Sequence, residues 1–200
     1  MKKVILALAA VLVFTHVSHS QNAPVQLGTN VASLGLGIGG HYGSYTTSSR
    51  SPGISLQLDH GFWEAGPGVV TLGAYIGTKT LKYNYNFKSY AANGILYTYA
   101  AHQKWNYTII GARGAYHYNG LKNAQNFDLY GGLMLSYNIL SYKYSDDYPG
   151  ADTFYAGSYG SYADLSLFAG GRYFFSPMWG AFLELGYGVS YVTVGASAKF

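Results

Sequence analysis

The chain contains no cysteine among its 200 residues. This absence excludes disulfide frameworks, thiolate zinc sites, iron–sulfur clusters, cysteine nucleophiles and lipid attachment through a thiol. Charge is scarce as well: Asp, Glu, Lys and Arg together make up 10% of the residues, against about 25% in an ordinary soluble domain. Aromatic residues, in contrast, account for 18%. So few charges beside so many aromatic rings indicate an exterior that faces lipid.

The charges that are present do not form a basic surface. The 12 Lys and Arg residues stand against 8 acids and are scattered along the chain. Without a run of basic residues after residue 20, nucleic acid is not an expected partner. With 49% hydrophobic residues and a formal net charge of only +4, the chain is not disordered either.

Long apolar runs are missing, apart from one near the start. That run, residues 4–14, follows Lys2 and Lys3 and is followed by small residues. It is much shorter than the roughly 20 residues that span a bilayer as a helix, so it is typical of a secretory signal peptide. We expect residues 1–20 to be cleaved and residues 21–200 to form one domain beyond the inner membrane.

The mature chain alternates between apolar and polar residues with a period of two. In the last segment, for example, Val192, Val194 and Ala196 alternate with Thr193 and Gly195. Such a strand has one apolar face and one small or polar face. Eight segments follow this pattern: 30–41, 53–62, 68–79, 105–118, 127–140, 162–174, 179–188 and 190–200.

The connections between these segments predict the fold. Three of them, residues 42–52, 80–104 and 141–161, are long, and they alternate with short ones. An even number of strands with long loops at one end and short turns at the other is typical of an outer-membrane barrel. The prediction is therefore an all-β, eight-stranded antiparallel up-and-down transmembrane β-barrel. A soluble eight-stranded barrel or sandwich with its apolar face inward is the alternative, but the other face has few charges for contact with water.

Aromatic residues cluster where the predicted strands would cross the two membrane interfaces, as expected for aromatic girdles. At the short-turn end they are Phe62, Trp63, Tyr116, Phe127, Phe174, Trp179 and Phe200. At the long-loop end they are Tyr42, Trp105, Tyr107, Tyr137, Tyr142 and Tyr187.

The last strand carries the most specific resemblance. Its apolar residues and a final aromatic residue are Tyr191, Val192, Val194, Ala196, Ala198 and Phe200. The whole mature chain resembles the small eight-stranded outer-membrane barrels of Gram-negative envelopes, the OmpA/OmpX-like and OmpW-like proteins. The resemblance implies that Phe200 is part of a signal read by the barrel assembly machinery. It also implies that both termini lie in the periplasm, that the long loops lie outside the cell and that the barrel is surrounded by outer-membrane lipids.

The predicted inward face carries four acids and four bases. They are Asp59, Asp128, Asp164 and Glu184, and Lys79, Arg113, Arg172 and Lys199. Because a buried carboxylate is costly unless it is paired, we expect these structural lumen charges to form ion pairs. The interior of an eight-stranded barrel is just wide enough for side chains to fill. Inward aromatic residues should complete the filling: Tyr75, Tyr130, Phe168, Phe182 and Tyr191.

We expect no catalytic residue, cofactor or metal. The G-x-G-x-x-G pattern at Gly35, Gly37 and Gly40 is not followed by a helix, which a dinucleotide site requires. The histidines of the mature chain lack a metal-ligand spacing and are expected at interfaces or in loops. They are His41, His60, His102 and His117.

The predicted function is a structural or surface-interaction role. A monomeric barrel with a side-chain-filled lumen would present Tyr-rich loops to an extracellular ligand or surface. Two alternatives stay open. One is a narrow porin-like channel for small or hydrophobic solutes. The other is a lipid A-modifying enzyme, which would need His41 or His102 beside a nucleophile.

Overall fold

Eight strands form a closed antiparallel ring in this computed structural model, which describes residues 23–40, 49–90, 94–121, 125–147 and 160–200. The strands are β1 (Asn30–Ile38), β2 (Ser49–Arg50), β3 (Gly53–Ala65), β4 (Gly68–Tyr90), β5 (Leu96–Tyr118), β6 (Phe127–Asp146), β7 (Tyr162–Phe174), β8 (Trp179–Gly186) and β9 (Val192–Lys199). The two-residue β2 lies outside the ring, against β4. The predicted signal peptide, residues 1–20, lies outside the described residues. Within the described ranges, no helix is long and apolar enough to cross a membrane.

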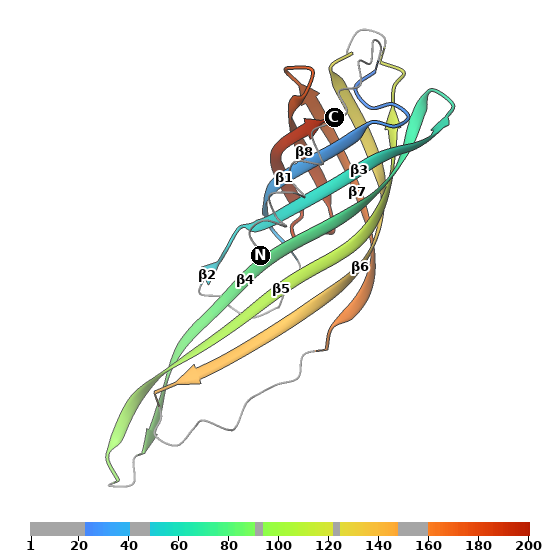
Figure 1. The fold of residues 1–200 in the computed structure, drawn as a ribbon. Coiled ribbons are helices and arrows are strands. Elements are labelled where there is room, and N and C mark those ends of the chain that lie inside the picture. The colour runs from blue at the N-terminus through green and yellow to red at the C-terminus, as the bar shows by residue number, and fades with distance from the viewer. Residues whose placement is uncertain (1–22, 41–48, 91–93, 122–124, 148–159) are drawn as a thin grey trace, which may run out of the picture.

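The ring closes because the first long strand pairs with the last. β1 pairs with β9 from Val31↔Lys199 to Ile38↔Val192, and every other neighbour in the ring is adjacent in sequence order (Figure 1). Closure gives every strand of the ring a paired neighbour on both sides, which is the condition for strands to cross lipid. The predicted up-and-down barrel of eight strands is confirmed.

The two faces of the wall are inverted relative to a water-soluble protein. On β3, Ile54 and Leu56 are exposed on the outside, whereas Ser55, Gln57 and Asp59 are buried in the lumen. The other strands of the ring repeat this arrangement, with leucine and isoleucine outward. An apolar outer band around a polar interior is what a lipid environment requires.

The predicted long loop at residues 80–104 is wrong, because most of it is strand. β4 and β5 have 23 residues each, and β6 has 20. Their outer parts, residues 81–90, 96–105 and 141–146, continue past the ring as a three-stranded extension, which we call the projecting sheet (Figure 1, lower left). These residues form strand because the alternation of inward and outward side chains continues past the barrel wall, although the residues there are more polar.

The apolar face changes sides along β4. Inside the barrel wall, Ile76 points outward and is 46% exposed. In the projecting sheet, Tyr83 and Tyr85 take the face that continues the lumen, and Lys82 and Asn84 take the outside. This switch marks the end of the outer apolar band, since lipid favours apolar side chains outside only along the band.

Several predicted girdle residues face inward instead. Phe174 is buried in the lumen, and Trp105 packs against Tyr142 on the lumen side of the projecting sheet at a ring distance of 5.3 Å. Tyr137 and Tyr187 do face outward. Tyr107 is partly buried against the interior cluster, and Tyr42 lies outside the described residues. Trp105 and Tyr107 pack against the apolar cluster at the end of the barrel nearest the projecting sheet, which we call the upper end although it points downward in Figure 1. Phe174 lies at the opposite, lower end.

Candidate functional site

A network of buried ion pairs crosses the middle of the lumen. Asp59 joins both buried guanidiniums: its Oδ1 lies 3.1 Å from Arg113 Nε and its Oδ2 lies 2.6 Å from Arg172 Nη2. Arg172 Nη1 also lies 3.4 Å from Asp128 Oδ2. These four residues come from β3, β5, β6 and β7, so one charge cluster links half the wall of the barrel.

Glu184 extends the network to a fifth strand, β8. Its Oε2 accepts hydrogen bonds from Arg113 Nη2 at 2.9 Å and from the Tyr130 hydroxyl at 3.0 Å. Its Oε1 accepts one from Gln57 Nε2 at 3.1 Å. The carboxylate is thus held on both oxygens, as a buried charge requires.

Aromatic rings cover the two guanidiniums. Arg113 Cζ lies 4.0 Å from the ring centroid of Phe168, and Arg172 Cζ lies 4.4 Å from that of Tyr130. These are cation–π distances, and they place rings where a water column would otherwise run. At this level the lumen is filled with paired charges and stacked rings.

The expectation that His117 lies at an interface or in a loop is wrong. The side chain is fully buried on the lumen face of β5, four residues from Arg113, and its ring stacks on Tyr130 at 5.3 Å. Its Nδ1 lies 2.8 Å from Asp128 Oδ1, and its Nε2 lies 3.1 Å from Thr71 Oγ1. His117 is four residues from Arg113 on the same strand, and side chains an even number of residues apart lie on the same face, so the sequence already indicated this inward position.

The chain Thr71–His117–Asp128 has the connectivity of a nucleophile, a base and an orienting acid. However, the three residues are at most 1% exposed. Asp128 is also shared with Arg172. A hydrolase needs a site where substrate reaches the nucleophile. The arrangement therefore satisfies buried polar groups inside the barrel.

The other three predicted lumen charges lie apart from this network. Lys79 is buried near the upper end of the wall, and its Nζ donates to the Gly39 carbonyl. Asp164 is only partly buried. Lys199, also partly buried, has its Nζ 4.7 Å from the ring centroid of Phe174 at the lower end.

A segment before β1 closes the lower end of the lumen. Val25 has no exposed surface and packs with Val31 and Phe174. Its carbonyl accepts a hydrogen bond from Asn119 Nδ2 at 2.9 Å. Because the backbone of Gly28 also bonds Gly61 O at 2.8 Å, this segment is tied to the wall on both sides. Within this segment Val25 is the residue that enters the lumen, since Leu27 is 55% exposed. We call residues 25–28 the lower plug.

The link between β8 and β9 closes the upper end. Val189 is fully buried in a cluster with Tyr75 and Met134, and its backbone N donates to the Tyr75 hydroxyl at 3.2 Å. Ser190 is 3% exposed. We call residues 188–190 the upper plug. It displaces Tyr191, which was expected to point inward but is exposed on the outside.

Glycines make the space for the upper plug. A Cβ at Gly37 or Gly53 would lie 2.4 Å from Ser190 atoms, and one at Gly77 would lie 3.0 Å from Val189 Cβ. The glycines of three adjacent strands thus allow the close approach of another backbone. The glycine-rich face of β1 was visible in the sequence, but what approaches it was not.

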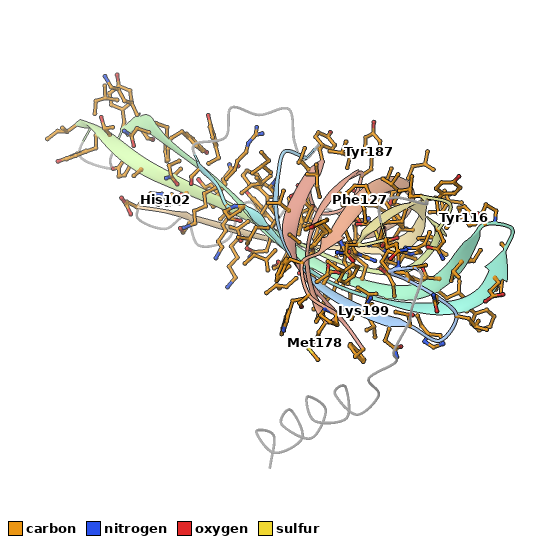
Figure 2. All side chains as sticks on the ribbon, turned by 90° about the horizontal axis from the view of Figure 1, so that it is seen from above. His102, Tyr116, Phe127, Met178, Tyr187 and Lys199 are labelled. Carbon is orange, nitrogen blue, oxygen red and sulfur yellow. The ribbon has the colours of Figure 1, made fainter. Side chains whose placement is uncertain are left out.

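The projecting sheet carries lysines on its outer face. Lys82 pairs directly with Lys104, and Lys104 pairs directly with Lys143, so one lysine row crosses three adjacent strands. His102 lies one step further out on the same face, with Nδ1 3.0 Å from Asn84 Oδ1 (Figure 2).

Aromatic residues cover the opposite face of the projecting sheet. Rings of Tyr83 and Tyr85 stack at 5.3 Å, and Tyr85 is followed by Phe87 at 6.3 Å. Phe87 in turn lies 5.8 Å from Tyr99 on β5. The sheet therefore offers one basic face and one aromatic face above the barrel.

The remaining histidines do not assemble a reactive site. His60 is exposed on the outside, with Nδ1 2.9 Å from Asn30 Oδ1. His102 lies on the projecting sheet, at the opposite end of the molecule from Tyr116, which marks the short-turn end (Figure 2). His41 lies outside the described residues. Among the residues that the structure describes, no three His, Cys, Asp or Glu side chains form a group that could hold a metal ion.

Comparisons with known proteins give weak likenesses only. No protein-family model and no curated protein sequence matches the chain. Among solved structures, Ail, the attachment invasion locus protein of Yersinia pestis, in complex with the heparin analogue sucrose octasulfate, is 13% identical. Its TM-score is 0.46, and the match covers 88% of this chain and 100% of that one.

The same protein without that molecule is 12% identical with a TM-score of 0.45, again over 88% of this chain and 100% of that one. Its backbone structure in a phospholipid bilayer nanodisc is 14% identical with a TM-score of 0.42, over 86% of this chain and 99% of that one. We assign the architecture of this chain from its own ring of strands and from the apolar and polar faces of that ring. The closed ring of eight strands, the filled polar lumen and the apolar outer band make it a small transmembrane β-barrel of the kind that the sequence resembles.

Proposed function

We propose that this protein is an outer-membrane barrel whose projecting sheet is an interaction surface at the cell surface. The lumen has a lower plug, an ion-pair network and an upper plug, so a filled interior serves as a rigid base for the sheet. The short turns lie at the opposite end, which supports a periplasmic position for them and an extracellular one for the sheet.

The lysine row carries this proposal and suggests the chemistry of the partner. Lys82, Lys104 and Lys143 occupy directly opposite positions on neighbouring strands. Neighbouring strands lie about 4.8 Å apart, so like charges are brought close together. Like charges in directly opposite positions destabilise a sheet. A partner that carries several anionic groups would offset this repulsion.

We therefore infer a polyanionic partner, such as a sulfated or phosphorylated glycan. Its negative groups would lie along the row, and the exposed face would let lysine side chains adjust to their spacing. Binding of this kind should weaken as ionic strength rises, because exposed charges are screened within about 10 Å at 0.1 M salt.

The test is binding of a fluorescent sulfated oligosaccharide to intact cells that display the barrel. The row variant Lys82→Gln/Lys104→Gln is compared with Arg50→Gln/Lys88→Gln, which removes the same charge from exposed positions outside the row. We expect binding to wild type and to the control, and a loss of at least about tenfold in the row variant, equivalent to about 1.4 kcal/mol.

Two results would count against the proposal. Equal losses in both variants would show that net charge, not the row, attracts the probe. Wild-type cells that bind no more probe than cells without the barrel would refute the polyanionic partner.

A further inference from the structure

An apolar groove runs along the outside of the barrel where β7 and β8 part. The last pair between these strands is Phe168↔Gly186, but β7 continues to Tyr162 with β6 alone. The groove has a volume of about 720 Å³, within the roughly 300–1,000 Å³ of ligand pockets. It is lined by Leu167, Phe168, Ala169, Leu185, Gly186, Tyr187 and Tyr191.

No charged side chain lines the groove. Leu167 and Leu185 form its sides and are 64% and 54% exposed. Tyr187 and Tyr191 stand at its upper end, with their rings edge to face at a centroid distance of 5.6 Å. Tyr187 lies on the outside of the wall in Figure 2. The lining is therefore apolar along its length and aromatic at the end nearer the projecting sheet.

The groove is a consequence of the upper plug. After Gly186 the chain turns into the lumen, where Val189 and Ser190 are buried, and it returns to the wall at β9. The backbone N of Tyr187 still bonds Leu167 O at 3.2 Å, which fixes the floor of the groove at the end of the β7–β8 ladder. The hollow is thus formed by the course of the main chain and is not a gap left by mobile side chains.

We propose that this groove holds one acyl chain of a membrane lipid from the leaflet on the side of the projecting sheet. The groove is continuous with the outer apolar band, since Leu183 on β8 extends the exposed apolar surface below it. Tyrosine rings favour the boundary between the acyl region and the headgroups, so Tyr187 and Tyr191 place the upper end at that boundary. An acyl chain entering from the surrounding leaflet would lie along the groove with its headgroup beyond the rings.

Packing supplies the specificity of this site. Leucine is no more apolar than a lipid tail, so an ordinary wall position does not select one lipid over its neighbours. A groove with side walls gives a chain more surrounding atoms at contact distance than a smooth wall does. One lipid should therefore exchange more slowly than the others.

The experiment is native mass spectrometry of the full barrel released from phospholipid nanodiscs into detergent. Ala169→Phe fills the groove from the outward face of β7. Ala181→Phe adds the same ring to an outward position on β8 outside the groove. Heat-modifiable migration on gels checks that both variants fold. We expect one phospholipid to stay bound to wild type and to Ala181→Phe, and Ala169→Phe to retain at least about tenfold less.

Other results would overturn the site. Equal retention by Ala169→Phe and Ala181→Phe would place the lipid elsewhere, and no retained lipid on wild type would show that the groove has no resident chain. A retained mass matching detergent or a free fatty acid would refute a lipid as the occupant. Should Ala169→Phe fail to fold, Tyr187→Ala removes the aromatic end instead, and unchanged retention in that variant would equally contradict the proposal.

Discussion

At the scale of residues, Asp59 holds the interior together because it contacts both buried arginines. Removing its charge would leave Arg113 and Arg172 with fewer carboxylate partners in a site that excludes water. Breaking a buried ion pair by changing one partner costs about 3–5 kcal/mol, far more than the pair contributes relative to an apolar replacement.

We therefore expect Asp59→Asn to lower the free energy of unfolding by about 3–5 kcal/mol. Asp164→Asn is the matched control, since Asp164 is partly exposed and lies outside the network, and it should change stability by no more than about 0.5 kcal/mol. Urea titrations of the protein in lipid vesicles measure both. Similar costs for the two substitutions would show that the network is not a stabilising centre.

The sequence was enough to predict which face of the wall each side chain takes, but not which side chains meet across the lumen. The alternation placed Asp59, Arg113 and Glu184 inward because side chains change face at every residue of a strand. The same rule would have placed His117 inward. Nothing local, however, indicated that Val25 and Val189 would enter the lumen, since a plug depends on packing between segments far apart in the chain.

At the scale of elements, β4 shows how lipid and water select opposite faces of one strand. Leu72, in the barrel wall, is exposed to lipid, and Asn84, in the projecting sheet, is exposed above it on the same outer face. β4 is longer than the predicted strand, residues 68–79, because its outward residues change from leucine and isoleucine to lysine and asparagine beyond the wall. The continued alternation of side chains indicates strand, and the change of the apolar side chains from the outer to the inner face indicates the membrane boundary.

Arginine scanning along β4 tests this boundary. Leu72→Arg should destabilise the barrel by roughly 2–4 kcal/mol in a lipid refolding titration, because the charge would enter the middle of the apolar band. Asn84→Arg should cost no more than about 0.5 kcal/mol, since its side chain remains in water. If both positions cost the same, the proposed membrane boundary is misplaced.

The orientation of the barrel gives a second test at this scale. A single cysteine at Lys88, near the end of β4, should react with a membrane-impermeant maleimide on intact cells. A cysteine at Pro177, in the exposed turn between β7 and β8, should react only after the outer membrane is opened. Labelling in the reverse pattern would turn the proposed orientation around and remove the projecting sheet from the cell surface.

At the scale of the whole molecule, Phe200 adds to the pairing of β1 and β9 that closes the ring. The backbone N and O of Phe200 bond Asn30 O and N at 3.0 and 2.9 Å, so the last residue fastens β9 to β1. Deleting it would remove these bonds together with its ring. A substitution that keeps the backbone therefore separates assembly from stability.

We expect Phe200→Ala to lower the amount of folded, heat-modifiable barrel in cells, if the terminal aromatic residue is read during assembly. The purified variant should still refold in detergent, because the two backbone bonds remain. Val194→Ala, an outward substitution elsewhere on β9, is the control. Normal cellular assembly of Phe200→Ala would argue against an assembly signal at this position.

Conductance of the refolded protein in a planar bilayer tests most directly whether the lumen is closed. Two plugs and a network of paired charges lie across the lumen among the described residues, so we predict no stable open level for wild type. Gly37→Trp, which would press against Ser190, probes whether the upper plug can be displaced. A steady, porin-like conductance of the wild-type barrel, reduced when Gly37 is replaced by Trp, would contradict the closed lumen and establish a channel instead.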